Sequence, residues 1–134
     1  MDVELTLDAF REARLAHRIE VATGGQQALD YAFGIGLYAD RGRFPLPDVI
    51  LLDLKMPGID GFEVLRRLKA DRLLRRVPVI VLTSSSEEGD LTKSYDIGTN
   101  SYLVKPAAFH GFVDVVSKID HYWLKLNVRP GATL

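Results

Sequence analysis

The sequence predicts an α/β domain built around one parallel β-sheet, and three observations support this class. Two apolar runs, Asp48 to Asp53 and Val77 to Thr83, have the continuous hydrophobicity of strands that are buried on both faces. A shorter strand-like segment, Ser101 to Lys105, follows them. Helical patterns separate all of these segments, and strands that alternate with helices pair in parallel through crossover connections.

The first third of the chain contains two helical patterns and one short alternating segment. Val3, Leu7 and Phe10 form an apolar stripe at helical spacing, whereas Ile19 and Val21 alternate with polar neighbours. The predicted elements are a helix from Asp2 to about Ala16, a strand at Ile19 to Val21, a helix through Ala28 to Phe33 that ends near Gly34, and an exposed loop from Asp40 to Pro47.

Capping signals place the remaining helices. Asp60 with Glu63, and Ser85 with Glu88, have the spacing of a capping box at a helix N-terminus. The predicted helices are one after Asp60 that buries Val64, Leu65 and Leu68, one after Ser85 that reaches Gly98, and a last one from about Ala108 to Leu126.

Composition and charge exclude several classes of protein. The 134 residues carry 17 Lys plus Arg against 18 Asp plus Glu, a net charge of −1, which argues against nucleic-acid or membrane-surface partners. There is no Cys, and the three His are too scattered to suggest a metal cluster. No apolar run approaches the ~20 residues of a membrane span, and the acidic N-terminus is unlike a signal peptide. We therefore expect a cytoplasmic protein.

Polar residues stand at the ends of the three clearest strands. Asp53, Thr83 and Lys105 supply a carboxylate, a hydroxyl and an ammonium group. Ligands of open parallel sheets bind beyond the carboxyl ends of the strands, so these groups are expected to lie together. A carboxylate nucleophile beside a hydroxyl and a cation is suited to receiving a phosphoryl group.

Three motifs resemble the response-regulator receiver family of two-component signalling. They are DVILLDLKMPGIDG at 48–61, VIVLTS at 79–84 and SYLVKP at 101–106. The resemblance implies a flavodoxin-like, doubly wound sheet with strand order 2-1-3-4-5. It covers a receiver domain at residues 1–126 and leaves a C-terminal tail at 127–134.

The resemblance also implies a role for each site residue. Asp53 would be the phosphoacceptor, Thr83 the hydroxyl that moves to the phosphoryl oxygen and Lys105 the ion-pair partner. Tyr102 would be the rotameric switch, and Asp53 with the backbone carbonyl of Lys55 would bind Mg²⁺. A further expectation is a cis peptide bond before Pro106, which would aim the Lys105 amine at the site.

The N-terminus departs from the family pattern. The chain starts at Met1-Asp2, inside the turn that follows the family's first strand, so that strand and both acidic magnesium ligands are absent. We expect Met1 to be an internal residue of a longer protein; a pseudo-receiver is the alternative. The missing strand would lie between Ile19–Val21 and Val49–Leu52, so the gap should be closed, filled by a neighbour's strand, or leave the chain poorly stable. Mg²⁺ should bind weakly, and phosphorylation should be slow or absent.

The last predicted helix is apolar over a wide arc, which indicates a second packing surface and a homodimer. The predicted interface residues are Phe112, Val115, Ile119, Tyr122, Trp123 and Leu126. The apolar end of this helix also resembles stand-alone receivers that are paired with phytochrome-type histidine kinases. The chain leaves no room for a DNA-binding domain after it, so we expect the signal to leave through protein contacts.

The leading function is a phosphoacceptor that takes a phosphoryl group from a histidine kinase within a phosphorelay. In this reading the protein is not an enzyme with a separate substrate, although it assists its own phosphorylation and dephosphorylation. One alternative is a phosphorylation-independent interaction module, motivated by the missing acidic pair. The other is a small nucleotide or flavin binder, which would need a phosphate-binding loop that the sequence lacks.

Overall fold

The computed structural model of the chain describes residues 3–14, 18–56 and 58–128. Its sheet contains three parallel strands in the order β1-β2-β3, namely β1 (Ile50–Leu52), β2 (Val79–Thr83) and β3 (Ser101–Val104). All residues of β2 are buried, as expected for a central strand with helices on both faces. The predicted α/β class is confirmed, and the order agrees with the 3-4-5 part of the expected strand order.

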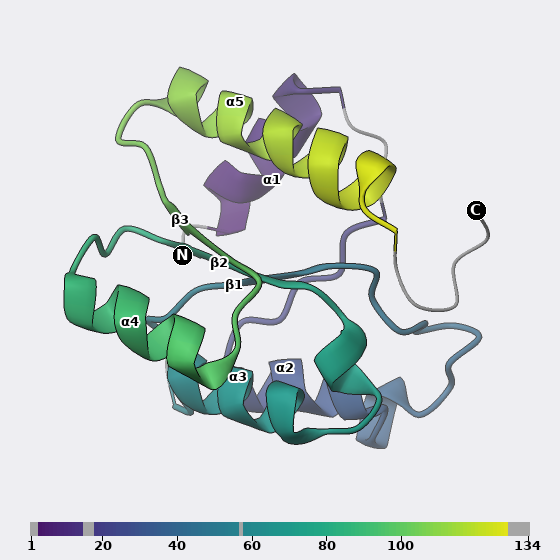
Figure 1. The fold of residues 1–134 in the computed structure, drawn as a ribbon. Coiled ribbons are helices and arrows are strands. Elements are labelled where there is room, and N and C mark those ends of the chain that lie inside the picture. The colour runs from purple at the N-terminus through teal and green to yellow at the C-terminus, as the bar shows by residue number, and fades with distance from the viewer. Residues whose placement is uncertain (1–2, 15–17, 57, 129–134) are drawn as a thin grey trace.

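Helices cover both faces of this sheet (Figure 1). One layer contains α1 (Val3–Glu12) and α5 (Phe109–Ile119), and the other contains α2 (Gly25–Phe33), α3 (Gly61–Ala70) and α4 (Glu88–Ile97). Short helical turns lie at η1 (Gly36–Tyr38) and η2 (Leu74–Arg76). None of the helices among the described residues is long and apolar enough to cross a membrane.

Each helix layer has its own hydrophobic core against the sheet. On one side, the predicted stripe of α3, Val64, Leu65 and Leu68, packs with Leu29 of α2 and Val79 of β2. The core on the other side consists of Ala9, Phe10, Leu82, Phe112 and Val116. The predicted apolar faces of these helices therefore do face the sheet.

One of the two predicted helix caps is present. The Asp60 side chain accepts a hydrogen bond from Glu63 N–H at 2.9 Å and caps α3. The predicted box of Ser85 and Glu88 is wrong, since α4 begins after Glu87 without a side-chain cap at that residue. The Ser85 hydroxyl instead donates to the Asp90 carboxylate at 2.6 Å, so a link to the first turn of α4 replaces the box.

The last helix continues to Leu126 as predicted, but its backbone changes. After Ile119 it becomes the π-helical segment η3 (Asp120–Leu126). Phe112, Val116 and Ile119 are buried, whereas Tyr122 and Leu126 are 50% and 58% exposed. The division of the chain at residue 126 into a domain and a tail stays a prediction.

The strand expected at Ile19 to Val21 does not form, and that prediction is wrong. Residues 18–22 have no strand assignment, and a cavity of about 510 Å³ separates them from β1. A strand needs a neighbouring backbone for its hydrogen bonds, and no described residue provides one here. The gap expected from the sequence is thus present and is not closed by movement of the flanking segments.

Candidate functional site

The parallel sheet brings the three predicted strand-end residues to one edge. Asp53 directly follows β1, Thr83 ends β2 and Lys105 follows β3. The Lys105 Nζ atom lies 3.5 Å from Asp53 Oδ2, although 52 residues separate them in the sequence. The backbone N–H of Lys105 donates to the Thr83 carbonyl at 2.7 Å. A carboxylate, a hydroxyl-bearing residue and a cation therefore meet as the sequence predicts.

Asp53 is held as an anion. Its side chain is 7% exposed, and its Oδ1 atom accepts a hydrogen bond from Lys55 N–H at 3.0 Å. Burial raises the pKa of the Asp53 carboxyl, but interactions that favour the anion, among them this hydrogen bond and the Lys105 charge, outweigh it and lower the pKa below its usual value. The carboxylate is therefore ionised at neutral pH and available as a nucleophile.

A glycine behind Asp53, which the sequence reasoning missed, fixes how closely α3 approaches the site. A Cβ atom on Gly61 would collide with the Asp53 carbonyl oxygen and lie 2.6 Å from Leu54 Cα. The Gly61 N–H also donates to the Leu54 carbonyl at 3.1 Å. The sequence feature that could have indicated this close approach is a glycine directly after the cap residue Asp60, at the first position of α3.

Ser85 connects Thr83 with Tyr102, and it too was missed as a site residue. The buried Thr83 hydroxyl oxygen accepts a hydrogen bond from Ser85 N–H at 3.4 Å. The Tyr102 hydroxyl donates to the Ser85 carbonyl at 2.9 Å, which holds the half-buried ring against the loop after β2. A movement of the Thr83 side chain can thus be transmitted to Tyr102 through Ser85 alone.

The expected cis bond between Lys105 and Pro106 is wrong, because the described residues contain no cis peptide bond. A trans bond is the intrinsically preferred form even before proline. The Lys105 amine reaches the Asp53 carboxylate with the trans bond.

The described residues do not fit a strong magnesium site. Mg²⁺ prefers octahedral coordination by oxygen atoms, commonly including carboxylates. Within the described part of the chain, no group of three or more His, Asp or Glu residues is arranged to hold a metal ion. Asp53 and the Lys55 carbonyl, the two predicted ligands, are a small donor set for this ion.

The geometry agrees with comparisons to known proteins. A family model described as response regulator receiver domain matches residues 3–117. The chain is 42% identical over 127 residues to the probable methanogenesis regulatory protein FilR2 of Methanothrix harundinacea, and this alignment covers 95% of this chain and 79% of that protein. It is 33% identical over 131 residues to the response regulator Rcp1 of Synechocystis, covering 98% of this chain and 87% of Rcp1.

Solved structures with this fold include two response regulators. The Mn²⁺-bound form of Rcp1 has a TM-score of 0.85 at 32% identity, with 97% of this chain and 91% of that chain covered. RPA3017, a response regulator in red light signalling of R. palustris, has a TM-score of 0.91 at 36% identity, with 98% and 92% covered. Because the family model and these relatives extend over most of its length, the chain belongs to the response regulator receiver domain family of two-component signalling.

Proposed function

We propose that Asp53 accepts a phosphoryl group from a histidine kinase and that the protein passes the signal on through protein contacts. The observation that carries this proposal is the 3.5 Å approach of the Lys105 ammonium to the buried, ionised Asp53 carboxylate at the ends of the strands. The cation offsets the charge that would otherwise repel an anionic phosphoryl donor.

The transfer requires only groups that the site and the kinase supply. An Asp53 oxygen attacks the phosphorus atom of a phosphohistidine, an oxygen–phosphorus bond forms and the phosphorus–nitrogen bond breaks. The departing imidazole nitrogen keeps the electron pair and takes a proton from solvent. The product is an acyl phosphate on Asp53, whose oxygens lie within reach of the Lys105 ammonium.

Thr83, Ser85 and Tyr102 are proposed to carry the response. To reach a phosphoryl oxygen, the Thr83 hydroxyl would leave its long 3.4 Å contact with Ser85 N–H. The loop that contains Ser85 also holds Tyr102, through the 2.9 Å bond to its carbonyl. Movement of this loop would therefore change the position of the Tyr102 ring and alter the surface near β3 and α4.

Magnesium is proposed to bind this chain weakly. The small donor set at Asp53 supports this, and no step above depends on a bound metal. Rcp1, a relative, has a Mn²⁺-bound structure. The quantity to compare between Rcp1 and this chain is therefore the affinity for a divalent metal ion. We also propose that self-catalysed phosphorylation from small phosphodonors is slow.

The proposed kinase is of the phytochrome type, and the proposed location is the cytoplasm. The similarity to RPA3017, which takes part in red light signalling, supports this choice of kinase. The sequence likeness to Rcp1 extends over nearly the whole chain, including the segment after α5.

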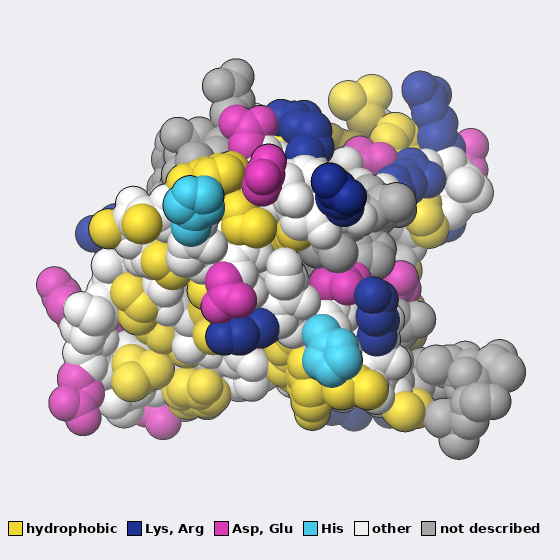
Figure 2. Space-filling model, turned by 90° about the horizontal axis from the view of Figure 1, so that it is seen from above, with side chains coloured by type: hydrophobic (Ala, Val, Ile, Leu, Met, Phe, Trp, Pro, Cys, Tyr) yellow, Lys and Arg dark blue, Asp and Glu magenta, His cyan; other side chains and the backbone are white. Residues whose placement is uncertain are grey.

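We further propose a homodimer through α5 and η3. Tyr122 is half exposed, and its ring packs edge-on against Trp123 with centroids 5.0 Å apart. Leu126 is also exposed at the end of the same segment. On the face formed by α1 and α5, apolar side chains lie among acidic and basic ones (Figure 2), which suits a dimer interface with ion pairs at its rim.

Mass spectrometry of the intact protein tests the phosphoacceptor. The chain is incubated with acetyl phosphate, with and without MgCl₂, beside Asp53→Asn and the surface control Asp96→Asn. We expect slow gain of one phosphoryl group by the wild type and the control, and none by Asp53→Asn. Uptake by Asp53→Asn equal to that of the wild type would contradict the assignment of Asp53 as the phosphoacceptor.

A further inference from the structure

Four exposed arginines lie at the end of the sheet where β1 and β2 begin. Arg43 belongs to the loop before β1, and Arg72, Arg75 and Arg76 belong to η2 and the turn that leads into it. Because β1 and β2 are parallel neighbours, both segments reach the same edge of the sheet (Figure 1). Asp53 follows the other end of β1, so these four arginines, here called the arginine edge, lie at the opposite edge from it.

None of these four guanidinium groups has an acidic partner within the described part of the chain. Arg43 packs over the ring of Phe44, with its guanidinium carbon 5.3 Å from the ring centroid. Arg66 and Arg67 of α3, in contrast, both pair with Glu63 at 3.1 Å. The arginine edge therefore offers four cations to an external anion, although the net charge of the whole chain is −1.

Two carboxylates close in sequence to these arginines are occupied by backbone N–H groups. The Asp71 carboxylate accepts a hydrogen bond from Leu73 N–H at 3.0 Å. Asp40 Oδ1 accepts one from Gly42 N–H at 3.0 Å and a longer one from Arg43 N–H at 3.4 Å. These acids therefore shape the two turns and do not form ion pairs with the arginines.

η2 is held firmly against the rest of the fold. Leu74 is 2% exposed and belongs to the core between the sheet and the layer of α2 and α3. The Lys69 ammonium donates to the carbonyls of Arg75 and Val77, each at 3.3 Å, and to Asn100 Oδ1 at 2.9 Å. An ordered backbone loses little further entropy on binding, so η2 is suited to present its side chains to a partner.

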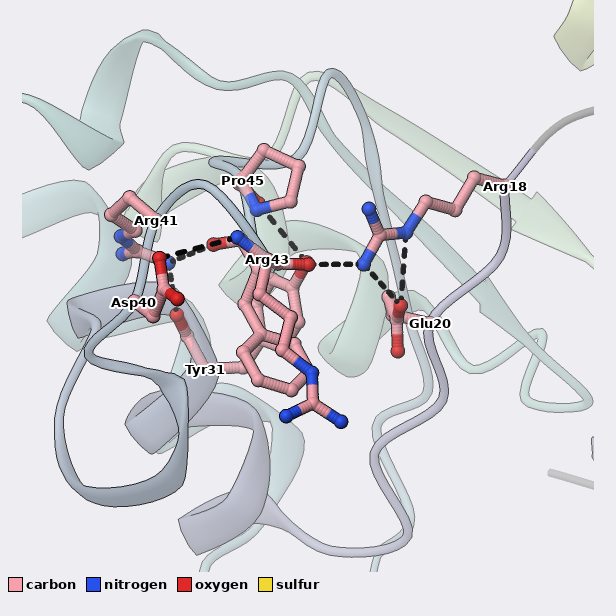
Figure 3. A network of polar contacts seen from close by, with 8 residues as sticks. Arg18, Glu20, Tyr31, Asp40, Arg41, Arg43 and Pro45 are labelled. Carbon is pink, nitrogen blue, oxygen red and sulfur yellow. Dashed lines mark hydrogen bonds and ion pairs between the residues drawn. The ribbon is translucent and has the colours of Figure 1, made fainter.

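Hydrogen bonds also fix the loop that carries Arg43 (Figure 3). The Arg41 guanidinium donates to the Tyr31 carbonyl at 2.8 Å, which joins the loop to the end of α2. The Tyr31 hydroxyl donates to the Pro45 carbonyl at 3.0 Å, and Arg18 donates to the Arg43 carbonyl. The Arg43 guanidinium takes part in none of these contacts, so it stays available to a partner.

Leu73 indicates what kind of anion fits the arginine edge. Its side chain is 56% exposed, and it lies between Arg72 and Arg75 in the sequence. Guanidinium groups bind carboxylates in a two-pronged geometry, and an exposed leucine among them suits a ligand that also carries apolar side chains. An acidic peptide has both features. A nucleic acid fits less well, because it offers no aliphatic side chain and the chain as a whole is not basic.

We propose that the arginine edge binds an acidic segment of a partner protein, in which Asp or Glu residues are interspersed with leucine-like residues. A second copy of this chain is a poorer occupant. Its exposed acidic turn, at Glu87 and Glu88, follows the opposite end of β2, and contacts between unlike faces of identical chains do not close into a dimer. The proposed site does not depend on phosphorylation of Asp53, and its occupant leaves the Asp53 edge open to a kinase.

Peptide binding to the intact chain tests the proposal. The probe is a fluorescein-labelled synthetic peptide, GEDLEELDG, and its matched control, GQNLQQLNG, carries amides in place of the carboxylates. The double variant Arg75→Gln/Arg76→Gln removes two charges from the arginine edge. The control variant Arg66→Gln/Arg67→Gln removes the same charge from α3. Fluorescence anisotropy measures affinity in about 50 mM and about 300 mM NaCl, because salt screens contacts between exposed charges.

The expected result is binding of the acidic peptide by the wild type and by the control variant, with weaker binding at the higher salt concentration. Arg75→Gln/Arg76→Gln should bind the peptide roughly fivefold or more weakly. Leu73→Ser, which removes the apolar contact, should weaken binding by about threefold.

Three outcomes of the peptide measurements would overturn the proposal: no binding of the acidic peptide, equal affinity for the amide peptide, or an equal loss of affinity in the two double variants. Tighter binding of a short DNA duplex than of the acidic peptide would identify a nucleic acid as the ligand. Self-association in sedimentation velocity that only Arg75→Gln/Arg76→Gln abolishes would identify a second copy. Either of these results would also overturn the proposal.

Discussion

Replacing Gly61 by Ala tests how tightly the start of α3 packs behind Asp53. The added Cβ would collide with the Asp53 carbonyl oxygen and lie 2.6 Å from Leu54 Cα and 3.1 Å from the Asp53 carbonyl carbon. These are backbone atoms, which cannot rotate away as the end of a side chain can. The loop after β1 and the first turn of α3 must therefore separate.

The expected cost follows from two opposed effects. Overpacking in a tight site costs about 1–3 kcal/mol, and the contacts with backbone place Gly61→Ala at the upper end. Alanine in place of glycine in a helix offsets up to about 1 kcal/mol of this cost. We expect Gly61→Ala to lower the free energy of unfolding by about 1–2 kcal/mol, measured by urea denaturation.

Gly89 supplies the matched control for this substitution. It lies in the first turn of α4, and a Cβ atom there would have no neighbour within 4 Å. Gly89→Ala should therefore raise the free energy of unfolding by about 0.4–1 kcal/mol. If Gly61→Ala were as stable as the wild type, or gained as much as Gly89→Ala, the close approach of α3 to the phosphoacceptor would be wrong.

Three further predictions concern acid, metal and assembly. Because the pKa of Asp53 is lowered in the folded protein, its stabilising contribution is present above the unfolded carboxyl pKa of about 4 and is lost as the pH falls through the lower folded pKa. The stability of the wild type should thus fall more steeply on acidification than that of Asp53→Asn in urea titrations, and parallel curves would contradict this. About 10 mM MgCl₂ should stabilise the chain by less than ~0.4 kcal/mol in thermal melts, because we expect a dissociation constant above that concentration. A larger stabilisation would reveal a stronger magnesium site. Trp123→Ala should move the protein from dimer toward monomer in light scattering, whereas Leu37→Ala, at an 86% exposed position, should not; an unchanged dimer in both would reject the α5–η3 interface.

The sequence predicts those elements whose stability is local or whose pattern is strong. The run before Thr83 is a fully buried strand, the run before Asp53 is a strand of which Leu52 is buried, and the stripe of Val64, Leu65 and Leu68 is buried. A continuous apolar run indicates a buried strand, and an apolar stripe at helical spacing indicates the helix face that meets the core. The meeting of Asp53 with Lys105 follows from parallel topology, since carboxyl ends of parallel strands share an edge.

The errors concern features that depend on partners outside the local sequence pattern. Ile19 and Val21 alternate as a strand does, but alternation cannot provide the neighbour that a ladder requires. Ser85 has the spacing of a capping residue, yet its hydroxyl binds Asp90, which the local pattern did not include. The need for glycine at 61 arises only when α3 is brought against the backbone of Asp53 and Leu54.

The three site residues differ in how firmly the described sheet holds them. Thr83 ends the fully buried central strand, and Lys105 is tied to it by the 2.7 Å bond to the Thr83 carbonyl. Asp53 follows a strand of three residues that pairs with β2 on one side within the described part of the chain and lines the 510 Å³ cavity. A short strand that is paired on one side has fewer ladder bonds to restrain its backbone than a central strand has. Among the described residues, the phosphoacceptor is therefore held by fewer ladder bonds than its hydroxyl and cation partners, which are fixed by the central strand.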